Sequence, residues 1–427
     1  MRDWIGFLWL SLCLTTSAFA EPHVALVVGN SAYGAVGTLP NPAKDAAPLA
    51  DALKSEGFKA TLAQDATAPI APPTVAALKT PEPTACDRLA AAPFDPDLTK
   101  GFPSVLKGGK INPDAAIPAC RRALETSPDD RRVRFQLARA LQSGKKFEEA
   151  KLEYEQAASA GSASAMNNLG VLYKNGWGVA KDYAQARAWL QKAADQGDAD
   201  AQYNLGALYL NGQGVAKDYV QARGWLQKAA DQGDPDAQYN LGVAYLNGFG
   251  VAKDYAQARA WFQKAADQGD ATAQYNLGAV YANGRGVAKD YAQARAWFQK
   301  AADQGDAGAQ NNLGQLYMDG QGVAKDYAQA RAWFQKAADQ GDAGAQYNLG
   351  AVYGNGFGVA TDYAQARAWF LKAADQGDAD AQYNLGVLYL NGQGVAKDYA
   401  QARAWFQKAA DQGNADAIEN LKELPRP

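Results

Sequence analysis

The chain carries three cysteines and one histidine, the side chains best suited to nucleophilic catalysis and to metal binding. Cys13 lies in an apolar N-terminal run, which leaves Cys86 and Cys120 for the rest of the chain. His23 is distant from both in the sequence. Two cysteines and one distant histidine do not supply the four ligands of a tetrahedral metal site. We therefore expect neither a metal nor a cofactor.

The two remaining cysteines are expected to form a disulfide if the chain reaches an oxidising compartment. A bridge between Cys86 and Cys120 would close a loop of roughly 35 residues and stabilise the fold by on the order of 3 kcal/mol in the chain-entropy model. Two unpaired thiols are the alternative.

The first twenty residues have the pattern of a secretory signal peptide. Arg2 precedes an apolar run from Trp4 to Leu14, and Ala18-Phe19-Ala20 provides the small residues of a cleavage site. The run is shorter than the ~20 residues that a membrane-spanning helix needs. We expect cleavage after Ala20, export to the periplasm and no stable membrane insertion of the mature chain. An uncleaved anchor is the alternative.

Residues 163–414 consist of seven consecutive copies of a 36-residue unit. One tryptophan in each copy fixes the period, at Trp189, Trp225, Trp261, Trp297, Trp333, Trp369 and Trp405. Repetition at this period is typical of stacked helix pairs, because a single pair cannot bury its apolar face alone.

The second copy, 199–234, predicts two helices. The first has an apolar face at helical spacing, formed by Ala201, Leu205, Leu208 and Tyr209. Gly206 beside this face would allow the partner helix to approach closely, and Gly212 would end the helix in the left-handed conformation. The second helix is expected to begin after the N-cap Asp218. Its buried stripe would comprise Tyr219, Ala222, Leu226 and Ala229, beside Trp225.

Four motifs recur in register through the copies: A-x-Y-N-L-G-x-x-Y, N-G-x-G-V, D-Y-x-Q-A-R-x-W and K-A-A-D-Q-G. They resemble the Sel-one-like (Sel1-like) repeat, a relative of the tetratricopeptide repeat with a longer loop between its helices. The resemblance implies an all-α fold, a right-handed α-solenoid that binds other proteins and has no chemistry of its own. The apolar spacing in 113–162 is that of tetratricopeptide-like helices, and 415–427 is expected to form a more polar C-terminal cap.

Residues 21–64 have a different pattern. A β-rich run at His23–Gly29 is followed by a helix-like stretch at Ala47–Glu56 and a short strand at Lys59–Leu62. The segments ALVVGNSAY and LPNPAKDA resemble the opening of the bacterial caspase-like (metacaspase, clan CD) domain. Such a protease needs a cysteine and a histidine downstream of this opening, and neither an S-G-H-G nor a D-x-C segment occurs. We interpret 21–64 as a truncated β-α-β remnant and expect no catalytic residue.

Residues 65–112 form a proline-rich linker and an irregular segment, with one short helical candidate at Cys86–Ala92.

Composition and charge argue against one class of partner, nucleic acids. The chain has 42 basic and 45 acidic residues, and the basic ones recur singly beside acids, so we expect no nucleic-acid partner. The recurring N-G-x-G-V segment serves a turn between helices and is not a phosphate-binding loop.

Two sets of residues are candidates for contact with a partner protein or peptide. One is a stripe on the first helices, with the asparagine that follows: Tyr203, Asn204, Tyr239, Asn240, Tyr275, Asn276, Tyr347 and Tyr383. The other occupies the variable connector position: Trp177, Phe249 and Phe357. The alternatives are that the tyrosines pack against the preceding repeat's second helix, that the connector aromatics pack over their own turn, and that the copies are recent duplicates.

These observations predict a non-catalytic interaction scaffold of the bacterial cell envelope, whose inner surface binds a protein or peptide. A pseudo-protease or regulator of caspase-like proteases is the alternative from another class. An accessory to a cell-wall or envelope enzyme is a third possibility.

Overall fold

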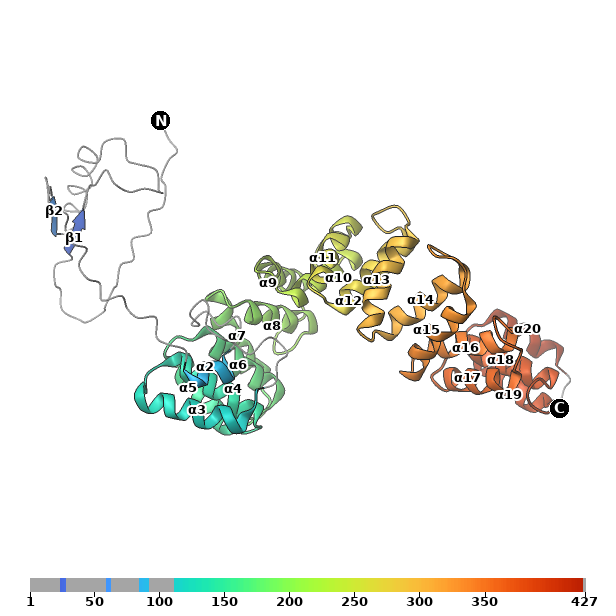
Figure 1. Cartoon of the computed structure of the whole chain (residues 1–427), viewed down its shortest axis with the longest axis horizontal. Helices are drawn as coiled ribbons and strands as arrows, with labels where there is room; N and C mark the ends of the chain where they lie inside the picture. The colour runs from blue at the N-terminus through green and yellow to red at the C-terminus, as the bar shows by residue number, and fades with distance from the viewer. Residues whose placement is uncertain (1–23, 28–58, 63–83, 92–110, 425–427) are drawn as a thin grey trace, which may run out of the picture. The chain divides into compact units, whose positions relative to one another are not determined.

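The computed structural model describes residues 24–27, 59–62, 84–91 and 111–424 (Figure 1). The chain divides into two units, Met1–Glu82 and Pro83–Pro427. In the first unit, β1 (Val24–Val27) and β2 (Lys59–Leu62) form a parallel pair with Val24 opposite Lys59. Both strands fall where the sequence predicts them. The helix predicted at 47–56, the cleavage site at Ala20 and His23 lie outside the described residues.

The second unit is built from helices, and from α3 onward they are connected by short loops (Figure 1). It begins with α2 (Ala85–Ala90), α3 (Pro113–Thr126), α4 (Arg131–Ser143) and α5 (Phe147–Ser159). The seven copies then supply seven pairs: α6 (Ala163–Asn175) and α7 (Tyr183–Asp195), α8 (Ala199–Asn211) and α9 (Tyr219–Asp231), α10 (Pro235–Asn247) and α11 (Tyr255–Asp267), α12 (Ala271–Asn283) and α13 (Tyr291–Asp303), α14 (Ala307–Asp319) and α15 (Tyr327–Asp339), α16 (Ala343–Asn355) and α17 (Tyr363–Asp375), α18 (Ala379–Asn391) and α19 (Tyr399–Asp411). The last helix is α20 (Ala415–Glu423). None of the described helices is long and apolar enough to cross a membrane.

Local capping signals set the ends of these helices. In α9 the N-cap carboxylate of Asp218 accepts hydrogen bonds from the backbone N–H groups of Val220 and Gln221, at 2.9 and 3.0 Å. The first helix of the same copy, α8, ends at Gly212, whose φ of 68° is left-handed. Because each copy repeats these signals, each helix begins and ends at the equivalent residue.

Each pair is closed by a contact that only glycine permits. A Cβ on Gly278 of α12 would lie 2.6 Å from Cδ1 of Phe298 on α13, which is inside van der Waals contact. Gly206 has the same relation to Leu226 in the second copy. The predicted close approach is therefore confirmed, and Leu205, Leu208 and Leu226 are almost fully buried.

The predicted apolar stripes need two corrections. Tyr209 and Tyr219 were expected in the buried faces, but both are half-buried. Tyr219 stands at the start of α9, where Phe249 in the connector of the following copy stacks on its ring and Lys217 Nζ lies 4.9 Å from the ring centroid. Its equivalents Tyr255 and Tyr399 are 37% and 43% exposed. The repeated tryptophan lies between copies, since Trp261 packs with Leu226 of the preceding copy.

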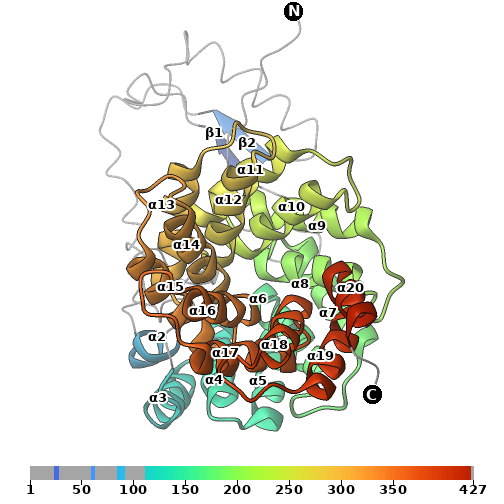
Figure 2. The same ribbon diagram turned by 90° about the vertical axis from the view of Figure 1, so that its right-hand side faces the viewer.

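Pairs follow one another along a superhelix in this unit. In Figure 2 the helices from α11 to α19 run counterclockwise while approaching the viewer, the sense of a right-handed superhelix. The first helices of neighbouring copies contact one another, α6 with α8 and α16 with α18. Figure 2 also shows the first helices on the inner side of the turn. Residues exposed on these helices therefore share an inner face.

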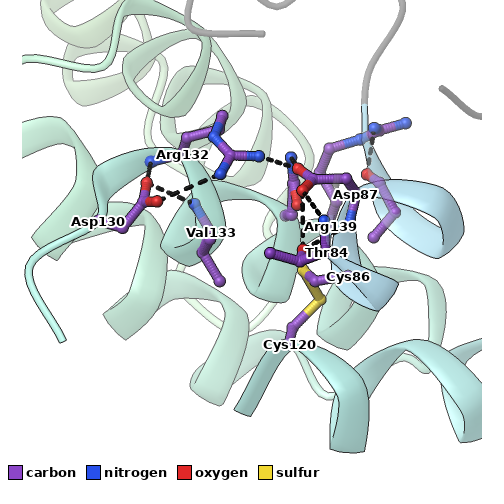
Figure 3. Close-up of a disulfide and its surroundings, with 10 residues drawn as sticks. Thr84, Cys86, Asp87, Cys120, Asp130, Arg132, Val133 and Arg139 are labelled. Atoms are coloured by element: carbon purple, nitrogen blue, oxygen red, sulfur yellow. Dashed lines mark hydrogen bonds and ion pairs between the residues drawn. A yellow bond between two sulfur atoms is a disulfide. The ribbon is translucent and has the colours of Figure 1, made fainter. Parts of the chain in front are cut away.

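The N-terminal end of the stack is covered by α2 (Figure 3). The structure joins Cys86 of α2 to Cys120 of α3 as a disulfide. The Asp87 carboxylate is fully buried, where it pairs with Arg132 and accepts a 2.9 Å hydrogen bond from Gln136 Nε2. These α4 partners satisfy a charge that would otherwise be costly to bury. The oxidation state of the two cysteines stays a prediction.

Gly278→Ala is expected to lower the thermal midpoint of unfolding, because the added methyl group collides with the Phe298 ring. Overpacking of this kind costs about 1–3 kcal/mol. Gly224→Ala is the matched control, since a Cβ at this helical glycine meets nothing within 4 Å. It should raise the midpoint through a gain in helix propensity of about 0.5–1 kcal/mol. Circular dichroism melts of both variants measure the two midpoints. Equal shifts of the midpoint in the two variants would contradict the predicted collision at Gly278.

The cysteine pairing is tested by thiol titration of the mature chain, denatured without reductant. Reaction of neither cysteine is expected, against two free thiols after reduction. Cys86→Ser should also lower the stability of the N-terminal helices by about 3 kcal/mol, because the unfolded chain gains entropy. Two reactive thiols in the unreduced chain purified from its native compartment would disprove the pairing.

Candidate functional site

The predicted tyrosine stripe lies on the inner face. Tyr203, Tyr239, Tyr275, Tyr347 and Tyr383 occupy equivalent positions on α8, α10, α12, α16 and α18, and all are half-buried. The Tyr239 ring lies 5.8 Å from the Phe262 ring, and three further copies repeat the contact at 5.7–5.9 Å. The alternative to partner contact was packing against the preceding repeat's second helix. The ring instead meets the second helix of its own repeat, because Phe262 fills the space above Gly242.

The tyrosine hydroxyls reach the next repeat. Burial is the main reason that the pKa of Tyr239 is raised, and the charge of Asp270 adds to it, while a hydrogen bond from Asn276 has the opposite effect. Tyr347 has the same arrangement with Asp380 and Asn384, and its pKa is also raised. Each phenol therefore stays protonated at neutral pH. Since its oxygen accepts from asparagine, the O–H proton is available for donation.

The asparagine row is held in a fixed orientation. Asn240 Nδ2 donates to the backbone oxygen of Asp236 at 2.8 Å, four residues earlier on the same helix. Asn276 and Asn384 repeat this bond at 2.8 Å. In the first two copies, Asn204 Nδ2 bonds Asn167 and its Oδ1 accepts from Lys174 Nζ at 3.0 Å. Fixing Nδ2 also fixes where the acceptor Oδ1 is presented.

The connector aromatics join neighbouring helix pairs. Phe249 stacks on Tyr219 of the preceding copy at 4.9 Å, and Phe357 stacks on Tyr327 at 5.4 Å. Trp177 stacks in the same way on Phe147 of α5 at 5.7 Å. One face of each connector ring is therefore covered by an aromatic ring of the preceding helix pair, and not by its own turn. The three side chains remain 36–40% exposed.

Differences among the copies gather on the inner face. The second helices are nearly identical, whereas two half-buried positions on the first helices change from copy to copy. One position holds Val171, Ala207, Val243, Ala279, Gln315, Ala351 and Val387. The other holds Lys174, Leu210, Leu246, Ala282, Met318, Gly354 and Leu390. The fifth copy also has Asn311 where most have tyrosine, and Asn348 Nδ2 bonds its Oδ1 at 2.9 Å.

The sequence analysis missed a glutamine pair, with one member buried and the other exposed, that links the copies. Gln274 of α12 is 5% exposed, and its Nε2 donates to Ala266 O of the preceding copy at 3.1 Å. Gln274 Oε1 accepts from Gln304 Nε2 at 2.8 Å, and Gln304 Nε2 also donates to Gly269 O at 3.0 Å. The sequence contained a signal for this pair, because the glutamine at the Gln274 position is replaced by an apolar residue at both ends of the stack. That residue is Met166 in the first copy and Ile418 in α20.

Across the described ranges, no group of three or more His, Cys, Asp or Glu side chains is placed to hold a metal ion. The cysteines of α2 and α3 are joined to each other. What the inner face offers is hydrogen bonding and apolar contact.

Comparison with known proteins assigns the repeats. The family model for the Sel1 repeat matches seven times, at 163–198, 199–234, 235–270, 271–306, 307–342, 343–378 and 379–414. A tetratricopeptide repeat model matches 112–169. Both matches leave residues 1–111 uncovered, so the caspase-like interpretation of 21–64 has no support from them. The search of curated proteins gave no match.

Two solved structures share the repeat architecture. One is c5321, a protective antigen of uropathogenic Escherichia coli strains with an SLR fold, at 38% identity and a TM-score of 0.66. The match covers 71% of this chain and 66% of that one. The other is a Sel1 repeat protein from Oxalobacter formigenes, at 37% identity and a TM-score of 0.56, covering 72% of this chain and 90% of that one.

The glutamine pair should show energetic coupling. Gln304→Ala removes a donor from the buried Gln274 Oε1, which is expected to cost about 1–3 kcal/mol. Gln274→Met, the residue of the first copy, removes the need for that donor. The double variant should therefore be more stable than the sum of the single effects predicts. Urea unfolding of the four proteins measures the coupling, and strict additivity would contradict the pair.

Proposed function

The chain belongs to the Sel1 repeat family, and from that premise we propose that it binds an extended segment of a partner protein on the inner face of its repeats. Sel1 repeat proteins are in general non-enzymatic interaction scaffolds. The proposal places this scaffold in the bacterial cell envelope, after export and cleavage at Ala20.

One observation carries the proposal. The copies differ at inner-face positions such as Ala279 and Ala282, while the glycine and tryptophan of the frame recur in all seven copies and the buried glutamine recurs in six. If packing alone determined these residues, the half-buried inner positions would be as uniform from copy to copy as those of the second helices. The copies also differ at buried positions such as Ala244 and Phe262, but there one apolar residue replaces another, whereas the inner-face positions also take polar or charged residues such as Gln315 and Lys174. A change of chemical character on an accessible face of a rigid frame favours contact with a partner of non-repeating sequence.

The chemistry of the face fits an extended peptide. Copies with the tyrosine present a phenol donor and an asparagine acceptor, as in Tyr239 and Asn240, and apolar side chains such as Val243 and Leu246 lie on the same helix. A peptide backbone offers N–H and C=O groups at regular intervals, and its side chains can contact the apolar positions. The exposed connector rings of Trp177, Phe249 and Phe357 would add contacts at the edge.

Photo-crosslinking tests the face directly. p-Benzoylphenylalanine is placed at Ala279 on the inner face of α12, or at Ala296 on the exposed side of α13, in the mature chain expressed in its native compartment. Ala279 should yield a discrete adduct with a partner, whereas Ala296 should not. An adduct at Ala296 alone would reject the inner face as the binding surface.

Residues 21–82 provide a second check on the proposal. A chain that begins at Pro83 keeps the second unit whole, including α2 and its disulfide. It should give the same Ala279 adduct as the mature chain. Loss of the adduct would transfer partner recognition to the N-terminal unit and revive the regulator hypothesis.

A further inference from the structure

A pocket of about 480 Å³ opens where the tetratricopeptide-like helices meet the first Sel1 repeat. Its wall includes Arg139 of α4, Lys145 in the loop after α4, Phe147 and Tyr154 of α5, Asn168 of α6 and Trp177 in the connector after α6. Asn168 is the first member of the asparagine row, so the pocket adjoins the inner face described above.

The charge of the pocket differs from that of the repeats. Two cationic side chains, Arg139 and Lys145, line it, and none of the described residues that line it is acidic. Along the tyrosine stripe the neighbouring charges are acidic instead: burial is the main cause of the raised pKa of Tyr203 and Tyr239, and Asp236 and Asp270 respectively add to it. The pocket is therefore a cationic position beside a row flanked by acids, and it favours an anionic group.

The backbone at Lys145 supports a role for its side chain. Among the described residues, Lys145 is the one non-glycine with positive φ, at 58°, and every other position of this kind is a glycine. Glycine adopts this conformation at lower cost than lysine. A lysine at the place where glycine would be more stable, on the rim of a pocket, points to a use for the ammonium group.

The remaining walls are rigid and partly aromatic. Trp177 and Phe147 stack with ring centroids 5.7 Å apart. The Tyr154 side chain is fully buried, and its hydroxyl donates to Gln142 Oε1 at 2.7 Å and accepts from Asn168 Nδ2 at 3.0 Å. Arg139 is held as well, because it donates to Ala90 O at 2.6 Å. An apolar group would pack against the rings beside the cations.

We propose that this junction pocket binds an acidic side chain of the partner segment together with an adjacent apolar or aromatic residue. The proposal rests on the proposed function and adds the chemistry of one end of the segment. Lys145 supplies the charge that recognises the carboxylate, Arg139 contributes to the same positive field, and the Trp177 ring contacts the apolar neighbour.

The test uses the mature chain with tryptophan labelled by ¹⁵N and two peptides, acetyl-Gly-Asp-Phe-Gly-amide and its Asn analogue. The Asp peptide should shift the indole resonance of Trp177, identified with Trp177→Phe, and the Asn peptide should bind about two- to fivefold more weakly. Lys145→Arg should keep the affinity. Lys145→Gly should weaken Asp-peptide binding by the same factor while its thermal midpoint stays equal or rises, because glycine relieves the backbone.

Equal binding of the two peptides, an unchanged affinity in Lys145→Gly, or shifts only at the repeated tryptophans would overturn the proposal. These outcomes are separable from failure of the proposed function. Inner-face adducts at Ala279 together with an unaltered Lys145→Gly variant would reject the pocket alone. Absence of those adducts would reject the binding face itself.

Discussion

The stack depends on the contact between a glycine of each first helix and a large side chain of the second. Where Gly278 faces Phe298 or Gly206 faces Leu226, the second helix approaches so closely that no Cβ could lie between them. This contact sets the geometry of a pair. The tryptophan then packs on the preceding copy, and the glutamine pair bonds to its backbone. With the frame fixed by these positions, the inner face was free to vary.

At the ends of the stack these contacts lack a partner, and the residues that make them are replaced. Among the described residues no second helix packs on α20, and there the glycine position is Lys422 and the glutamine position is Ile418. A glycine without a facing side chain would only weaken the helix, and a buried glutamine without its partner would lose a hydrogen bond. At the other end, α2 covers α3 and α4 through the Cys86–Cys120 bridge and the buried Asp87–Arg132 pair.

Interactions close in sequence, or repeated with the period, could be predicted, and the others could not. The helix ends, the Gly206 contact and the burial of Leu205 follow from capping residues and helical spacing. Asp87 lies in the segment predicted to be irregular, 45 residues before Arg132 of α4, so no period reveals their pairing. The ring that each tyrosine meets could not be predicted, because a stripe on one helix does not show which neighbour fills the space above its glycine. Strands β1 and β2 were located correctly, but two short strands do not identify a family.

The account implies that one rigid frame presents a variable inner face, with a cationic pocket at its N-terminal end. Sequence suggested that face from the tyrosines, while the pocket needed the structure, because Lys145 and Trp177 meet across a repeat boundary. The most direct measurement is a cryo-electron microscopy structure of the chain with its partner, purified as a complex from the cells that make it. We predict partner density along the inner sides of α8 to α18. Density confined to the second helices or to residues 21–82 would contradict the account.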